Sequence, residues 1–173
     1  MKTKNNLLII CSVFFLSNCS VHFDRPYSNT INTFPDEFIG KYIYIEQKDS
    51  TQDTILLNIS RDSVKYSDNF FLQGGKLNEN IKLAKGKKYY YLCQSDTVNN
   101  IEIWDIFPLK ISDKKLRVYV IDEEYYKKYI KKHFQKIDNK EIDNFYKMDE
   151  QEFDKFCKSK LKKKYSLKFI KTE

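Results

Sequence analysis

The sequence of 173 residues contains one alanine, four glycines, three prolines and two histidines. Neither His22 nor His133 has a spacing that pairs it with a cysteine, so the sequence predicts no metal site with His and Cys ligands. The motifs of a nucleophile elbow, a phosphate-binding loop and a zinc protease are also lacking. The sequence therefore predicts no catalytic residue, metal or cofactor, and we do not expect an enzyme.

The chain also lacks an apolar run long enough to cross a membrane. The uncharged run Leu7–Leu16 has ten residues, whereas a helix needs roughly 20 residues to cross about 30 Å of hydrocarbon. Lys2 and Lys4 precede the run, and small polar residues follow it, which is the order found in a signal peptide. Cys11 lies inside the run and Cys19 at its end, so Cys19 is the better processing site.

Residues 16–19, Leu-Ser-Asn-Cys, resemble the lipobox of bacterial lipoproteins, with Asn18 where that family usually has Ala or Gly. The resemblance implies that Cys19 is the lipid attachment site. Its thiol would receive a diacylglycerol, cleavage would precede it, and the new N-terminus would be acylated, for example with palmitate. Acyl chains would then hold the domain at the membrane. The alternatives are an ordinary signal peptide cut nearby and an uncleaved anchor.

The resemblance also implies a location in the cell envelope. Ser20, in place of Asp, resembles the pattern of lipoproteins sent to an outer membrane. Nucleic acid is not an expected partner in that compartment. The membrane, reached through the lipid anchor, is the partner that the sequence predicts first.

Four segments follow from composition and periodicity. Residues 1–18 are the predicted signal peptide, and residues 19–35, which lack periodicity and contain Pro35, are a predicted tether. Residues 36–121 are a predicted β-meander or barrel. Residues 122–173 are a predicted helical C-terminal extension packed on the same domain.

Charge is divided unevenly between the two parts of the mature chain. Residues 19–113 have 11 basic and 13 acidic side chains, whereas residues 114–173 have 18 basic and 11 acidic ones. The net charges are therefore −2 and +7. A cationic C-terminal part can attract an anionic membrane surface. The alternative is a lysine-rich helix face that is simply solvated. The many lysines would then reflect an A/T-biased genome, which the scarcity of alanine also indicates.

Short β-branched and aromatic segments separated by turn residues predict seven or eight strands with no helix between them. We therefore expect a mainly β fold, an antiparallel meander or small barrel with C-terminal helices. Apolar residues occur on both faces of some strands, as where Tyr42 and Tyr44 alternate with Ile43 and Ile45. Such a sheet must be covered on one face and curled or filled on the other. The predicted strands are residues 38–47, 53–60, 63–67, 69–73, 80–84, 87–94, 100–111 and 115–121.

Two helices are predicted after the strands. Asp122 is a fitting N-cap for residues 123–134, with acidic residues in the first turn and lysines towards the end. Asp149 and Glu152 have the spacing of a capping box, and Met148 and Phe153 that of a hydrophobic staple. Residues 135–148 are ambiguous between helix and strand, and residues 165–170 are typical of a returning strand.

Two cysteines remain in the mature domain if Cys19 is acylated. An envelope compartment permits disulfides, so Cys93 and Cys157 are either a disulfide or two separately buried thiols. Asp105, which follows Trp104 in a predicted strand, is the carboxylate best suited to a functional role. The alternative is that Asp105 faces water and has no such role.

Four Asp-Ser or Asp-Thr pairs resemble the acceptor of a general O-glycosylation system in some Gram-negative envelopes. Their hydroxyl residues are Ser50, Thr54, Ser63 and Thr97. The same dipeptides are also ordinary turn residues, and that is the alternative.

A further resemblance lies in Phe38, Gly40 and Tyr42, which are similar to the opening strand of lipocalin-like proteins, with Tyr where lipocalins usually have Trp. It implies a β-barrel whose mouth holds an apolar ligand. The expected function is thus a non-catalytic binding module for an apolar small molecule. The alternative is an accessory or inhibitory interaction subunit of an envelope protein complex, with an exposed aromatic patch on a filled barrel.

Overall fold

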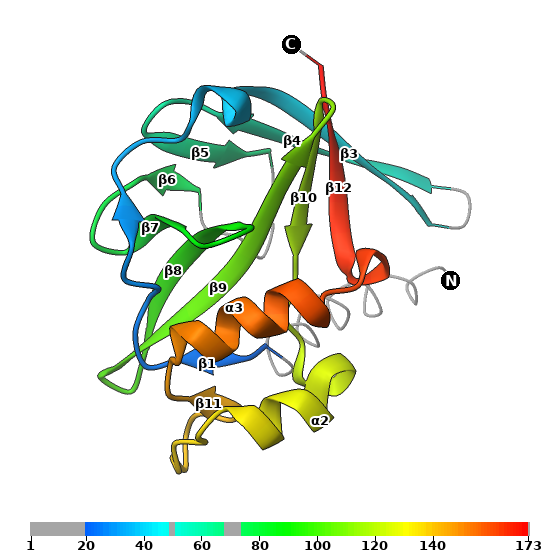
Figure 1. Cartoon of the computed structure of the whole chain (residues 1–173). Coiled ribbons are helices and arrows are strands. Elements are labelled where there is room, and N and C mark those ends of the chain that lie inside the picture. The colour runs from blue at the N-terminus through cyan, green and yellow to red at the C-terminus, as the bar shows by residue number, and fades with distance from the viewer. Residues whose placement is uncertain (1–19, 49–50, 68–73, 173) are drawn as a thin grey trace, which may run out of the picture.

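The computed structural model describes residues 20–48, 51–67 and 74–172. These residues form a mainly β fold in which a curled antiparallel sheet makes a half-barrel, with two α-helices packed at one end (Figure 1). This confirms the predicted fold class. In spatial order, the main path of the sheet consists of β2 (Thr30–Ile31), β7 (Ile81–Lys85), β8 (Tyr90–Val98), β9 (Ile101–Ser112), β10 (Lys115–Tyr119), β12 (Ser166–Lys171), β3 (Gly40–Lys48), β4 (Thr51–Ile59), β5 (Ser63–Tyr66) and β6 (Gly75–Lys76).

Most neighbouring strands are joined by short turns, as the sequence predicts. Asn99 and Asn100 join β8 to β9, and Asp113 and Lys114 join β9 to β10, all four with positive φ. Positive φ at both positions of a two-residue turn suits the twist of a hairpin, and Asn and Asp tolerate it better than most residues. The strand expected at residues 165–170 is β12, which returns between β10 and β3. The strand expected at 69–73 lies outside the described residues.

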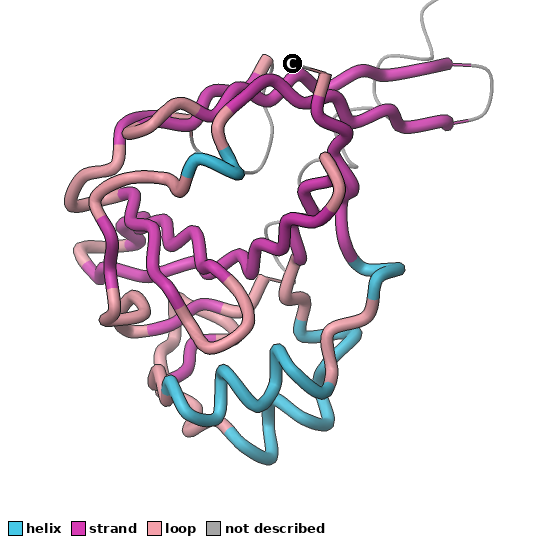
Figure 2. Tube along the Cα trace, turned by 45° about the horizontal axis from the view of Figure 1, so that its top comes forward, coloured by secondary structure: helices cyan, strands magenta, loops and turns pink. Residues whose placement is uncertain are grey.

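In the centre of the sheet both faces are apolar, and each is buried in a different way. On β8 and β9, one face packs against the helices, and the other lines the inside of the curl (Figure 2). The helix-side core includes Phe23, Tyr91, Trp104, Tyr126, Ile130, Phe153, Phe156 and Cys157. The barrel-side core includes Phe34, Phe38, Tyr42, Leu57, Leu83, Leu92, Phe107, Leu116 and Phe169. Full burial of each of the Leu, Ile and Phe side chains contributes about 1.5–3 kcal/mol.

The two helices begin at the predicted caps. The Asp122 carboxylate accepts from the Glu124 N–H at 2.7 Å at the start of α2 (Glu123–His133). Asp149 accepts from the N–H groups of Gln151 and Glu152 at 3.0 Å at the start of α3 (Glu150–Ser159). In a complete capping box, the Glu152 side chain would also accept a hydrogen bond from the Asp149 N–H. That part of the prediction was wrong, because the Glu152 carboxylate faces other partners. It pairs with Lys155, Tyr129 and His133.

The segment expected to be a tether is instead part of the fold. Within it, β1 (His22–Phe23) pairs antiparallel with β9 and parallel with β11 (Phe145–Tyr146). Val21, Phe23, Tyr27 and Phe34 are buried. The tether prediction was wrong because these apolar residues have no regular period and are buried by distant parts of the chain. Phe23, for example, packs against Phe134 and Phe153, more than 100 residues later. The ambiguous segment 135–148 contains β11, which pairs with this early segment.

Candidate functional site

The inside of the half-barrel is filled by the chain's own side chains. The 3-10 helix η1 (Asp36–Phe38) brings Phe38 into the curl, where its ring lies 5.0 Å from that of Tyr90. The Tyr42 hydroxyl donates to the Phe38 carbonyl oxygen at 2.8 Å, and burial raises the pKa of Tyr42 to about 12. Phe38 and Tyr42, two of the three residues on which the lipocalin-like resemblance rests, therefore belong to the packed interior.

The outer face of β12, β3 and β4 carries a row of aliphatic side chains. Ile170 on β12 is opposite Ile43 on β3, which is opposite Leu56 on β4. Residues directly opposite each other in neighbouring strands project from the same face of the sheet. Leu56 is 50% exposed and Ile170 is 40% exposed. We call Ile43, Leu56 and Ile170 the aliphatic row. Sequence reasoning missed it, although these residues alternate with core residues along their strands.

Basic side chains border the aliphatic row on the same face. Lys115 is opposite Ile170, and in the flanking rows Arg117 is opposite Lys168, and Lys41 and Lys65 are both opposite Asn58. In the described part of the chain, Lys65, Lys115 and Lys168 have no ion pair with an acidic residue. The sheet thus presents a strip of apolar surface between positive charges.

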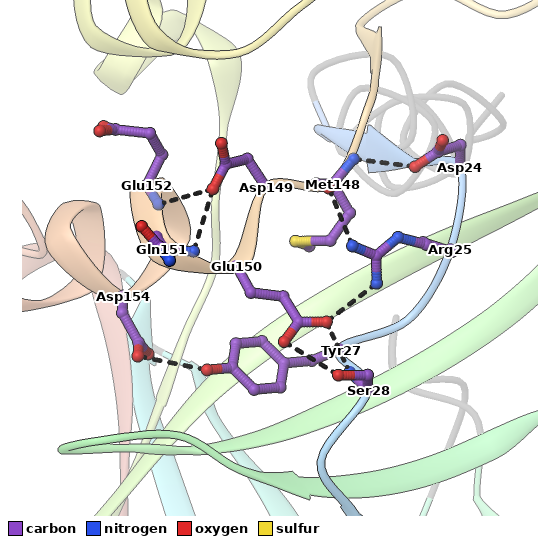
Figure 3. A network of polar contacts seen from close by, with 10 residues as sticks. All are labelled: Asp24, Arg25, Tyr27, Ser28, Met148, Asp149, Glu150, Gln151, Glu152 and Asp154. Atoms are coloured by element: carbon purple, nitrogen blue, oxygen red, sulfur yellow. Dashed lines mark hydrogen bonds and ion pairs between the residues drawn. The ribbon is translucent and has the colours of Figure 1, made fainter.

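A second arrangement of polar groups fixes the N-terminal segment to α3 (Figure 3). Arg25 donates to a Glu150 carboxylate oxygen at 2.9 Å and to the Met148 carbonyl at 3.2 Å. Ser28 donates to the same carboxylate through its N–H at 2.9 Å and its hydroxyl at 3.0 Å. Asp24 accepts from the Met148 N–H at 2.8 Å. Residues 24–28 therefore form a strap across the start of the helix.

These hydrogen bonds set the ionisation of Glu150. Burial raises the pKa of its carboxyl group, but the hydrogen bonds from Arg25 and Ser28 outweigh burial and hold that pKa below its usual value. A carboxylate with a lowered pKa in the folded state stabilises the fold above its ordinary pKa. That contribution is lost as the pH falls through the lowered pKa. The shallow polar depression beside these residues is lined by groups that already bind one another.

Two tyrosines share one carboxylate beneath the strap. Tyr27 donates to Asp154 at 3.2 Å, and Tyr91 donates to its other oxygen at 2.6 Å. Burial, and then the nearby Asp154 charge, raises the pKa of Tyr27. Burial likewise raises the pKa of Tyr91. Both phenols therefore stay protonated as donors, which suits a structural rather than a catalytic role.

The two cysteines lie in the helix-side core as separate, buried thiols. Of the two alternatives, this arrangement is the one without a disulfide. Burial raises the pKa of the Cys93 thiol to about 12, and burial also raises the pKa of Cys157 well above its usual value. A thiol that is neutral and enclosed is a poor nucleophile.

We expect neither thiol to react with an alkylating reagent in the folded protein at mildly alkaline pH. Both should react fully once the protein is unfolded without a reductant. Peptide-resolved mass spectrometry after iodoacetamide treatment would count label on Cys93 and Cys157 separately. Labelling that appears only when a reductant is added would mean that the two are bridged.

The remaining residues singled out in the sequence lie apart from one another. Cys19 and Ser50 fall outside the described residues. Thr54 and Thr97 are exposed on β4 and β8, whereas Ser63 is buried, with its hydroxyl 2.5 Å from that of Ser60. Because a glycosyl transfer needs an exposed hydroxyl, the folded chain offers Thr54 and Thr97 but not Ser63.

Asp105 has a partner that sequence reasoning did not foresee. His22 on β1 and Asp105 on β9 are opposite each other, and His22 Nδ1 lies 2.6 Å from a carboxylate oxygen of Asp105. The pair joins the early segment to the sheet. His133 is exposed, stacks on Tyr129 at 4.1 Å and lies 3.2 Å from Glu152. Within the described residues, no three metal-ligating side chains come together.

Comparison with known proteins gives no relative. No protein-family model matches the chain, and neither a curated protein nor a solved structure matches it. Among the described residues, no helix has the length and apolar character needed to span a membrane. The function must therefore be inferred from the surface and the interior of this fold.

Proposed function

We propose that this protein is a lipid-anchored, non-catalytic interaction module of the bacterial cell envelope, which binds another envelope protein through the aliphatic row. Of the two functions expected from the sequence, this is the accessory-subunit alternative. The observation that carries it is the apolar strip on the outside of a sheet whose inside is already filled. Exposed apolar groups with a polar rim are typical of protein contact sites.

The chemistry of the strip specifies the kind of partner. Leu56 and Ile170 are fixed by the strands that carry them, so they can dock without a large entropic cost. Lys115 and Lys168 flank them. A complementary partner has an apolar surface between acidic side chains. A stable contact needs about 1,200–2,000 Å² of buried surface in total, so the row is the centre of the interface and not its whole extent.

The sequence supports the anchor. Residues 16–19 resemble a lipobox, and Cys19 is the proposed site of lipid attachment. Ser20 favours transport to an outer membrane. The other function expected from the sequence is a carrier of an apolar small molecule, as in lipocalin-like barrels, and the curled sheet supports it. The packed interior gives such a ligand no support, so we place the interaction module first.

Photo-cross-linking in the native envelope tests the docking surface. With a photoreactive residue at position 56, we expect one protein adduct of discrete mass, since Leu56 would lie at the centre of the interface. The second substitution Ile170→Asp should abolish that adduct, because it places a negative charge in the apolar strip.

The matched control is a photoreactive residue at position 97, because Thr97 is exposed on β8, away from β12, β3 and β4. It should give no adduct of that mass. Equal adducts at both positions, or none at position 56, would contradict docking through the aliphatic row.

A further inference from the structure

We propose that the anchored domain rests on anionic phospholipid headgroups through one face, formed by Tyr125, Lys128 and Lys132 of α2 and by Lys162, Lys163 and Tyr165. We call these residues the anchor face. The inference rests on the proposed lipid at Cys19 and assigns the domain a single orientation at the membrane. Three observations carry it.

The first is that Ser20, the residue after the proposed lipid attachment site, is already part of the fold. Ser20 forms a β-bridge with Asp122, and the Val21 N–H donates to the Ile121 carbonyl at 3.3 Å. Val21 is already buried. Because one residue spans at most about 3.6 Å, Ser20 places the proposed lipid attachment point near the start of α2. The membrane surface must therefore meet this part of the domain.

The second observation concerns the aromatic residues at that point. The Val120 N–H donates to the Tyr165 carbonyl at 3.4 Å, which brings η2 (Lys163–Tyr165) beside the 120–122 link. Tyr125 stacks on Tyr165 with ring centroids 4.0 Å apart and planes within 8°. Tyr125 is nevertheless 52% exposed. Tyrosine is favoured at the boundary between hydrocarbon and water, where its ring contacts apolar groups and its hydroxyl contacts water.

The third observation is charge. Lys128 and Lys132 follow Tyr125 by three and seven residues, a spacing that places all three on one face of α2. Lys162 and Lys163 are exposed next to Tyr165, and the Lys162 N–H donates to the Tyr126 hydroxyl at 3.3 Å. Of the acidic residues at the start of α2, Glu123 pairs with Lys131 at 3.2 Å. Each lysine held at an anionic membrane surface contributes about 1 kcal/mol.

The orientation leaves the proposed docking surface free. In both overall views, α2 lies at one end of the molecule and the β3–β4 hairpin at the other (Figures 1 and 2). A domain seated on its anchor face therefore turns the aliphatic row away from the lipid, towards other envelope proteins. Lipid anchor, membrane contact and protein contact are then three separate parts of one chain.

The test uses the mature lipoprotein purified from a Gram-negative host after expression of the full chain. Its intact mass reports the diacylglycerol. The protein then carries one fluorophore, on Lys128→Cys or on Leu56→Cys. It is reconstituted into vesicles of phosphatidylcholine, with or without phosphatidylglycerol, that contain a headgroup-attached quencher. Unsubstituted protein taken through the same labelling corrects for the native thiols.

We expect several-fold stronger quenching at position 128 than at position 56 in vesicles with phosphatidylglycerol. The charge reversals Lys132→Glu and Lys162→Glu together should remove most of that difference. Equal quenching at the two positions in a protein that carries the diacylglycerol would overturn the orientation alone. A mature mass without the lipid would overturn the anchor and, with it, this inference.

Discussion

Replacement of Phe23 by alanine should lower the free energy of unfolding by about 3–5 kcal/mol, the usual cost of deleting a fully buried phenylalanine ring. The Phe23 ring is 0% exposed and meets Phe134 at 5.7 Å and Phe153 at 5.4 Å, both edge to face. The cavity would open where β1, β9 and the two helices meet. Urea denaturation followed by circular dichroism measures the effect.

The control for this substitution is Tyr125→Ala, which removes a half-exposed ring from the surface. We expect it to cost under about 1 kcal/mol, in line with most surface substitutions. If Phe23→Ala cost as little as Tyr125→Ala, residues 20–28 would be a tether after all. The anchor face would then lose its physical basis, because Ser20 would no longer be fixed beside α2.

Replacement of Cys19 by alanine should abolish incorporation of a labelled fatty acid and move the protein out of the membrane fraction. The reason is that each buried methylene of an acyl chain contributes about 0.8 kcal/mol, so the loss of the chains removes nearly all of the membrane affinity. Metabolic labelling with an alkynyl fatty acid, followed by fractionation, measures both effects. The lysines of the anchor face alone should hold only a small, salt-sensitive fraction at the membrane.

Cys11→Ala is the matched control, since Cys11 lies inside the apolar run and has no proposed role. It should leave labelling and membrane association as in the unsubstituted protein. A Cys19→Ala protein that still carried fatty acid, or that stayed in the membrane fraction after an alkali wash, would contradict lipid attachment at Cys19.

The strands and caps could be predicted because their signals are local. The β-branched and aromatic residues of 40–48 and 101–112 predict strands from their own neighbourhood. In the same way, Asp122 and Asp149 before helical periodicity predict the starts of the two helices. The two-sided apolar pattern also correctly indicated a sheet covered on one face and curled on the other.

The early segment could not be predicted in the same way, because its partners are distant. Phe23 is buried by Phe134 and Phe153, and Arg25 is fixed by Glu150, all more than 100 residues later. The pairing of His22 with Asp105 depends on the same docking. Both cysteines lie in the helix-side core as free thiols, and the number of cysteines alone does not predict whether they form a disulfide.

The aliphatic row was missed for a different reason. In strands with apolar residues on both faces, a sequence does not show which face another element will cover. Ile43 and Tyr42 look equally suited to a core, yet Tyr42 is buried and Ile43 is only partly so. The order β10-β12-β3-β4 decides the matter, because it brings Ile170, Ile43 and Leu56 into line on the uncovered face.

The most direct test of a lipid-anchored interaction module is native mass spectrometry of the mature protein, purified in mild detergent from its own membranes. We expect a chain that begins at Cys19, carries a diacylglycerol and an added acyl group, and is bound to a second polypeptide. A chain without lipid would contradict the anchor. A small apolar molecule released on unfolding, with no second polypeptide, would contradict the interaction module and make the protein a ligand carrier.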